Sequence, residues 1–247
     1  THCPAEITAV PDRVPLPLIE RIAAARREWQ LAHTSRRDLA YLERGVSAWN
    51  KWRLTTEGAR PNLSNIDLSG ADLSGADLSR VKLTRANLSG ARLVGTNFTG
   101  ADLGQVDFSG ANLREAVLVD ADAIWAKFVE TNLEDADLRR ITSIESDFIG
   151  ANLLRACLSE AKLSRSSAID ANFTKANLER AKLPGANFSG ANLSGASLQH
   201  SEAREADLSW AKLVAADLRD CNLVSAILAS ADFTSADLRM SDLSRAD

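Results

Sequence analysis

The chain has 247 residues, a net charge of −4 at pH 7 and an aromatic content of only 5%. No stretch approaches the roughly eighteen consecutive apolar residues of a membrane helix, and no charged-then-apolar signal segment opens the chain. These features exclude an integral membrane protein and predict a soluble, cytoplasmic one. The three cysteines, Cys3, Cys157 and Cys221, are an odd set without metal-like spacing, which indicates reduced thiols and neither a disulfide framework nor a zinc site.

Residues 1–60 carry two apolar stripes at helical spacing, so two helices are expected there. The first stripe comprises Leu18, Ile22, Ala25 and Trp29, and the second comprises Leu39, Leu42, Val46 and Trp49. Ser35, followed three residues later by Asp38, is a capping-box pattern between the stripes.

From Pro61 to Asp247 the chain repeats every five residues without an insertion or deletion. The central position of the repeat, first occupied by Leu63, is Leu in twenty-six of thirty-seven repeats and Phe in seven. The four exceptions are Ala123, Ser143, Ala168 and Ala203. A fixed short period of this kind indicates a solenoid.

An α-helix cannot bury this pattern, because a step of five residues turns about 500° and successive Leu would spiral around the helix. The small position, two residues before the central one, is Ala in twenty-five repeats. Residues two apart share one side of an extended segment, so both positions are expected to point inward.

The other three positions of the repeat predict a corner. The Asx position, one residue before the central one, is Asp or Asn in twenty-four repeats, and such side chains bond backbone N–H groups in turns. Ser or Thr is common at the first corner position, directly after the central residue. Gly is frequent at the second corner position, where turn geometry or tight stacking favours it.

This consensus, found as Ala-Asp-Leu-Ser-Gly at 71–75 and Ala-Asn-Leu-Ser-Gly at 191–195, resembles the pentapeptide-repeat family. The resemblance covers about three quarters of the chain. It implies a right-handed parallel β-helix of square section, with four repeats and hence twenty residues per coil. The thirty-seven repeats would then make about nine coils, or a rod roughly 45 Å long at about 4.8 Å per coil. The expected fold is an all-β solenoid (61–247) preceded by an α-helical segment (1–60).

With twenty residues per coil, successive central positions occupy adjacent sides of one layer, so small residues should lie beside large ones. Ala123, Ser143 and Ala168 are each followed one repeat later by Phe. Ala203 is followed by Leu208, and this predicts a local cavity or distortion.

The open end of a coil exposes unpaired backbone groups, and solenoids usually carry a cap there. Residues 45–53 are similar to the tryptophan-containing leader that precedes the repeats in some bacterial members of the family. Packing against the first coil is therefore predicted for Leu42, Val46, Trp49 and Trp52.

Nothing in the sequence indicates a catalytic, cofactor or metal site. The three histidines, His2, His33 and His200, fall in no nucleophile, metal or phosphate-binding motif. The many Asp residues recur at the position that forms the corners, so their number does not indicate a catalytic site. Outward residues twenty apart alternate in sign, as in Asp107, Lys127 and Asp147, which predicts surface ion pairs.

Outward positions are mostly Ser, Thr, Gly or charged, with one exception near the middle of the rod. Six residues on two neighbouring sides recur at twenty-residue intervals or lie beside such a column: Ile124, Trp125, Val129, Ile144, Ile149 and Ile169. If the coil period holds, they form a contiguous apolar surface, as at partner or dimer interfaces. Alternatively, the β-branched residues merely suit strands and are partly buried at corners.

Charge bears on the choice of function. Residues 1–60 hold ten Lys+Arg and seven Asp+Glu, whereas residues 61–247 hold nineteen and twenty-six, a net charge of −7. An acidic rod disfavours direct binding of nucleic acid, which needs a basic surface. A non-enzymatic scaffold that binds a protein partner, or a second copy of the chain, is the preferred hypothesis.

Two other functions are weighed against the scaffold. Some members of the family bind DNA gyrase or topoisomerase IV, imitate duplex DNA and protect against topoisomerase poisons. The sign of the charge fits this role, but a duplex of 45 Å carries about 26 negative charges. A sugar- or metal-dependent enzyme on a β-helix would need carboxylates or His clustered along a groove, and the corner role of Asp explains those residues without it.

Overall fold

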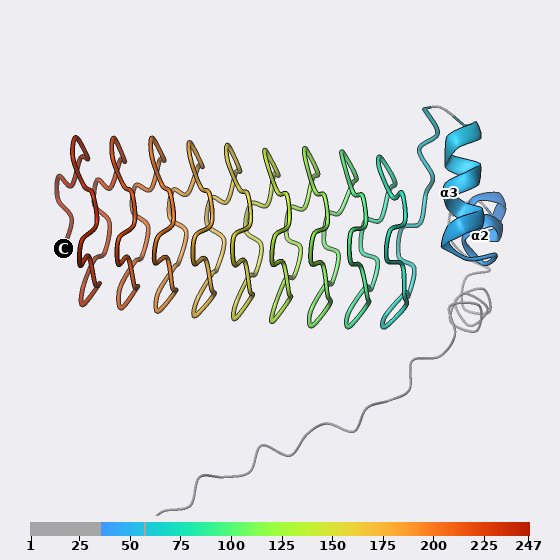
Figure 1. Ribbon diagram of the computed structural model, residues 1–247, viewed down its shortest axis with the longest axis horizontal. Coiled ribbons are helices and arrows are strands. Elements are labelled where there is room, and N and C mark those ends of the chain that lie inside the picture. Colours follow the sequence, from blue (N-terminus) through green and yellow to red (C-terminus); the bar gives the residue numbers. More distant parts are fainter. Residues whose placement is uncertain (1–35, 57) are drawn as a thin grey trace, which may run out of the picture.

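The computed structural model describes residues 36–56 and 58–247. Figure 1 shows a rod of stacked coils with α2 (Arg36–Leu42) and α3 (Val46–Thr55) at one end and the C-terminus at the opposite end. The first apolar stripe, within residues 18–29, and Ser35 of the predicted capping box lie outside the described residues. The solenoid expected from the five-residue period is present.

Neighbouring coils pair through parallel bridges, and every bridge joins residues twenty apart, as between Asn62 and Lys82. Four repeats therefore complete one coil, as the family resemblance implied. Each side of a coil contributes one bridging residue, at the Asx position, so the pairing consists of single bridges and not of long strands. The Leu68 N–H donates to the Asn87 carbonyl at 2.7 Å, and the Asn87 N–H donates to the Ile66 carbonyl at 2.8 Å.

The interior is filled by the central and small positions, which confirms that both point inward. Every residue at these positions is buried from Leu63 to Ala226. Phe108, Phe128 and Phe148 stack in successive coils, with ring centroids 5.2 and 4.6 Å apart. Aromatic pairs at this range stabilise a core by about 0.5–1.5 kcal/mol beyond the area they bury.

The corners are held by the Asx side chains, as predicted. All twenty-four Asp and Asn residues at this position accept a hydrogen bond from the N–H of the first corner residue, at 2.9–3.3 Å. The second corner residue has a φ between 53° and 69° in all thirty-seven repeats, yet twenty-seven of these residues are not Gly. A side chain in this left-handed region costs about 1–2 kcal/mol, which explains the preference for Gly.

Within the described residues, two helices precede the first coil: α2 (Arg36–Leu42) and α3 (Val46–Thr55). They replace the single helix expected from the second apolar stripe. Gly45 separates them, because its φ of 94° is incompatible with a helix and its N–H donates back to the Leu42 carbonyl. The stripe correctly predicted helical structure at these residues, but the positive φ of Gly45 divides that structure into two helices.

The four residues expected to contact the first coil lie on α2 and α3. Leu42 and Trp49 are fully buried, and Val46 and Trp52 are partly buried against the same core. Trp52 also stacks on Tyr41, with ring centroids 4.9 Å apart. The aromatic side chains of the two helices thus pack against each other as well as against the rod.

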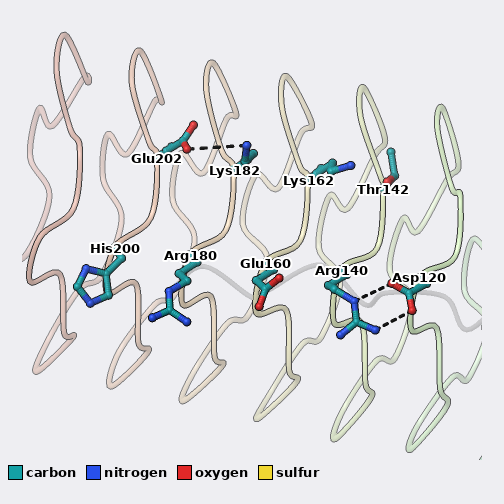
Figure 2. Close-up of a pocket in the computed structure, with 9 residues that line it drawn as sticks. All are labelled: Asp120, Arg140, Thr142, Glu160, Lys162, Arg180, Lys182, His200 and Glu202. Carbon is teal, nitrogen blue, oxygen red and sulfur yellow. Dashed lines mark hydrogen bonds and ion pairs between the residues drawn. The ribbon is translucent and has the colours of Figure 1, made fainter.

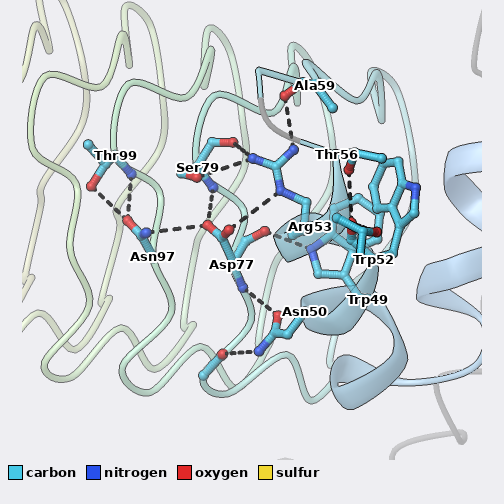
Figure 3. A network of polar contacts seen from close by, with 12 residues as sticks. Trp49, Asn50, Trp52, Arg53, Thr56, Ala59, Asp77, Ser79, Asn97 and Thr99 are labelled. Carbon is cyan, nitrogen blue, oxygen red and sulfur yellow. Dashed lines mark hydrogen bonds and ion pairs between the residues drawn. The ribbon is translucent and has the colours of Figure 1, made fainter.

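Side chains of α3 bind the backbone at the edge of the first coil (Figure 3). The indole N–H of Trp49 donates to the Asp77 carbonyl at 2.7 Å. The side-chain amide of Asn50 donates to the Gly75 carbonyl at 2.9 Å and accepts from the Asp77 N–H at 2.8 Å. A buried Trp and a reciprocal amide pair therefore satisfy polar groups that no preceding coil covers.

Arg53 of α3 extends this contact by donating to the Ser79 carbonyl at 2.7 Å. Inside the rod, the backbone of the preceding coil makes the equivalent bonds, as when the Asn97 N–H donates to the Ala76 carbonyl. At this edge, side chains of α3 make the hydrogen bonds that the backbone of a preceding coil makes elsewhere in the rod.

The core contains a void beside Ala203, which confirms the expected packing defect. The void is too narrow to hold a water molecule and is lined by Leu183, Phe188, Leu193, Leu198, Ala203, Ala206 and Leu208. Lost dispersion contacts around such a gap lower stability.

We expect Ala203→Val to lower the free energy of unfolding by less than about 1 kcal/mol, because the loosely packed side chains around the void can shift to take up part of the two added methyl groups. The matched control is Ala123→Val, on the same side of the rod in a coil where Phe128 is the neighbour. Overpacking there should lower stability by about 1–3 kcal/mol. Denaturant unfolding followed by circular dichroism measures both, and an equal loss in the two variants would contradict the void.

Charged residues twenty apart pair most closely at the corners, whereas pairs at the Asx position are longer, at 3.9 Å between Asp72 and Arg92 and between Lys182 and Glu202. Arg140 and Asp120 form a bidentate pair with N···O distances of 2.6 and 2.7 Å. Within the described residues, no ion pair joins Lys127 to Asp107 or Asp147. The prediction for that column is wrong: Asp107 and Asp147 each accept the N–H of their own corner, and neither pairs with Lys127.

Candidate interaction surfaces

The side chain of Trp125 is the most unusual feature of the corners. It occupies a second corner position with a φ of 58°, where a bulky residue is strained, and it is 55% exposed. Its indole N–H donates to Glu145, one coil later, at 2.8 Å. Glu145 accepts from Arg165 in the following coil at 2.6 Å. These three residues form a hydrogen-bonded column that we call the Trp125 ladder.

The ladder holds the indole in one orientation. The hydrogen bonds from Trp125 and Arg165 keep the pKa of Glu145 below its ordinary value, so this acceptor stays charged. An exposed aromatic that is already oriented loses little conformational entropy on binding. Trp210 has the same corner position and is 69% exposed, but within the described residues its indole makes no hydrogen bond.

The six predicted interface residues lie on two neighbouring corners near the middle of the rod. Ile124, Trp125 and Ile144 lie on one corner, and Val129, Ile149 and Ile169 lie on the next. Successive coils are joined there by backbone bonds, as from the Trp125 N–H to the Ile144 carbonyl at 3.1 Å. Ile149, at 38%, is the most exposed of the five aliphatic residues. Lys127 and Asp147 lie on the side between the two corners.

The apolar corner residues depart from the polar pattern of the surface. They occur in the same coils as the small residues that depart from the Leu or Phe pattern of the core. Ser69, Ser89, Ser109, Ser189 and Ser209 occupy the same column as Val129, Ile149 and Ile169, in the coils before and after them. Three of the four small central residues directly precede an Ile at the first corner position: Ala123, Ser143 and Ala168. The same coils are therefore altered inside and outside.

Charge is arranged in bands along the rod. Residues 101–160 contain twelve Asp+Glu and five Lys+Arg, a net charge of −7. Residues 81–100 contain three Lys+Arg and no acid, and residues 161–200 contain five Lys+Arg and two acids. The apolar corners lie largely within the acidic band, which basic bands flank on both sides.

A shallow groove of about 780 Å³ runs along the rod beside these corners. Figure 2 shows its two parallel rows of side chains, each crossing successive coils. One row comprises Asp120, Arg140, Glu160, Arg180 and His200, and the other comprises Thr142, Lys162, Lys182 and Glu202. This groove was not predicted from the sequence, although its rows are twenty-residue columns that the coil period brings together.

The described part of the chain contains no group of three or more His, Cys, Asp or Glu side chains that could hold a metal ion. None of its helices is long and apolar enough to cross a membrane. Cys157 is half-buried and Cys221 is buried, and burial raises the pKa of the Cys221 thiol.

Comparison with known proteins identifies the class of this rod. The sequence profile described as Pentapeptide repeats matches residues 62–100, 96–135, 126–165, 171–209 and 211–247, with eight copies. The chain therefore belongs to the pentapeptide-repeat family, and its rod is a right-handed β-helix. Proteins of this family are generally structural or binding proteins and not enzymes.

Two solved structures illustrate the relationship. HetL, a pentapeptide repeat protein involved in the regulation of heterocyst differentiation in the cyanobacterium Nostoc sp. strain PCC 7120, is 34% identical, with 80% of this chain and 92% of HetL covered and a TM-score of 0.58. QnrB1, a plasmid-mediated fluoroquinolone resistance protein, is 20% identical over 75% of this chain and 91% of its own, with a TM-score of 0.38. At that distance QnrB1 supports no functional argument. A comparison with curated protein sequences gives no significant match.

Proposed function

We propose that this protein is a non-enzymatic scaffold that binds a protein partner through the Trp125 ladder and the apolar corners around it. The observation that carries the proposal is the indole of Trp125, which is half exposed, held in a strained turn and fixed by Glu145. Trp surrounded by aliphatic side chains is typical of binding hot spots.

The proposal gives the two segments different roles. Residues 61–247 form a β-helix of about nine coils that displays the binding surface. Residues 1–60 form a cap, in which Leu42, Val46, Trp49 and Trp52 cover the first coil. The hydrogen bonds from α3 to the edge at residues 75–79 support this division.

The likeness to HetL supports a regulatory role exercised through binding. HetL takes part in the regulation of heterocyst differentiation, so a rod of this family with 34% identity serves a regulatory process. A second copy of the chain is included among the partners in this proposal. The cytoplasmic location stays a prediction from the sequence.

The test is a pair of charge substitutions, Trp125→Glu with Ile149→Lys, in the full chain. We expect the variant to keep its thermal stability and to lose its complex, because an anchor and its exposed neighbour both become charged. Affinity capture from native lysate and multi-angle light scattering measure hetero- and homo-complexes respectively. The matched control is Trp210→Glu with Val214→Lys, which makes the same charge changes at the same corner positions. A complex that survives in the first variant would remove this surface from consideration.

The acidic band favours a second candidate, a DNA-mimicking protein that binds DNA gyrase or topoisomerase IV. Three coils span about 14 Å, a length over which duplex DNA carries about eight charges. Residues 101–160 carry a net −7, so this band approaches the charge density of DNA although the whole rod does not. A gyrase supercoiling assay with and without a topoisomerase poison tests this candidate. If micromolar concentrations of the protein neither inhibit gyrase nor protect it from the poison, DNA mimicry is rejected.

A further inference from the structure

We propose that the charged groove binds an acidic, extended peptide segment of a partner protein. This site differs in chemistry from the Trp125 surface, and the proposal does not depend on that surface being an interface. It rests on three observations: the groove contains cations that are poorly paired within the chain, its lining mixes the two signs of charge, and it runs parallel to the rod.

The cations of the groove are available to a ligand because their internal pairs are weak. Lys182 lies 3.9 Å from Glu202, and Arg180 lies 3.6 Å from Glu179. Within the described residues, no ion pair involves Lys162. Elsewhere on the rod, five Arg side chains are held at 2.6–2.8 Å by a carboxylate: Arg139, Arg155, Arg165, Arg219 and Arg239. In the groove itself, Arg140 is held in the same way by Asp120. Three exposed cations thus converge on one groove without a close partner.

The arrangement of charges in the groove favours a peptide over a polynucleotide. Glu160 lies between Arg140 and Arg180 in one row, and Glu202 follows Lys182 in the other (Figure 2). A phosphodiester chain offers only acceptors and would be repelled by these carboxylates. A peptide offers carboxylates to the cations and backbone N–H groups to Glu160 and Glu202.

The dimensions of the groove suit a short extended segment. The row from Thr142 to Glu202 crosses three coil spacings, or about 14 Å at 4.8 Å each. A fully extended chain covers this length in about four residues, and alternate side chains then point to the same side. Two carboxylates of the segment can therefore face Lys162 and Lys182, while its backbone follows the axis of the rod.

The experiment measures binding of a fluorescein-labelled, eight-residue peptide of alternating glutamate and glycine by fluorescence anisotropy at low salt. We expect binding to the full chain with a Kd below about 1 mM, and weaker binding as salt is added. Lys162→Glu with Lys182→Glu should weaken binding at least about tenfold, because attraction becomes repulsion at both contacts. A surface substitution of this kind should leave the melting temperature nearly unchanged.

The matched control is Lys127→Glu with Lys212→Glu, which makes the same change in net charge at the same repeat position on two other sides of the rod. The Kd of this variant for the peptide should stay within about threefold of that of the unmodified chain. The variant Trp125→Glu with Ile149→Lys should also keep the peptide, so the failure of one proposal is distinguishable from the failure of the other.

Four results would overturn the proposal. The first is no binding of the glutamate peptide at millimolar concentration, and the second is an equal loss in the two lysine pairs. The third is equal binding of a peptide with glutamine in place of glutamate. The fourth is stronger binding of inorganic phosphate or a single-stranded oligonucleotide at the same lysines, which would assign the groove to another anion.

Discussion

Leu153→Asp should abolish cooperative folding of the rod. Leu153 is fully buried at a central position near the middle of the coils. A carboxylate there loses the burial of a Leu side chain and is itself desolvated without a partner, together about 5 kcal/mol or more. Most domains are stable by only about 5–15 kcal/mol, and each coil is supported only by its neighbours.

The control for this substitution lies one residue further along. Leu154 is a first corner residue and is only half-buried, so Leu154→Asp places the same charge on the outside of the same coil. We expect this variant to melt cooperatively within a few degrees of the unmodified chain, whereas Leu153→Asp shows no cooperative transition by circular dichroism. An unchanged melting temperature for Leu153→Asp would count against the core described here.

Trp49→Ala should destabilise the N-terminal end of the rod by about 3–5 kcal/mol, the usual cost of truncating a buried aromatic. The substitution also leaves the Asp77 carbonyl without the indole donor at 2.7 Å. Exposed backbone groups at this edge would then be unpaired. Hydrogen exchange should quicken first at residues 75–79, while coils in the middle of the rod keep their protection.

Trp210→Ala is the comparison for Trp49→Ala. Trp210 is 69% exposed, so its truncation should change the free energy of unfolding by no more than about 0.5 kcal/mol. If the two variants melt alike, or if exchange after Trp49→Ala quickens evenly along the rod, the helices do not cap the first coil.

The repeat made the fold predictable because two constraints recur in every five residues. Inward positions two apart are apolar or small, and an Asx side chain closes most corners, so a single consensus identified core and turns along the rod. The void at Ala203 followed from the same reasoning. The break at Gly45 did not, since Leu42 and Val46 remain in one helical stripe whether the chain continues or turns between them.

The surfaces were harder to predict, because they depend on side-chain direction as well as on spacing. Asp107 and Asp147 stand in one column with Lys127, but their carboxylates bond the N–H of their own corners and the expected ion pairs do not form. The ladder from Trp125 to Arg165 needs all three residues in left-handed corners. The sequence favours Gly at such corners and does not show that Trp, Glu and Arg adopt the same backbone.

The constant interval of the bridges gives this molecule a modular length. Removing or inserting one whole coil leaves every remaining residue on its original side of the rod, whereas a change of one repeat rotates everything beyond it by a quarter of a turn. If a partner binds one side of the rod, the rod is therefore expected to lengthen during evolution by whole coils of four repeats. Distance along the axis and direction around it can be varied separately, which a globular fold does not permit.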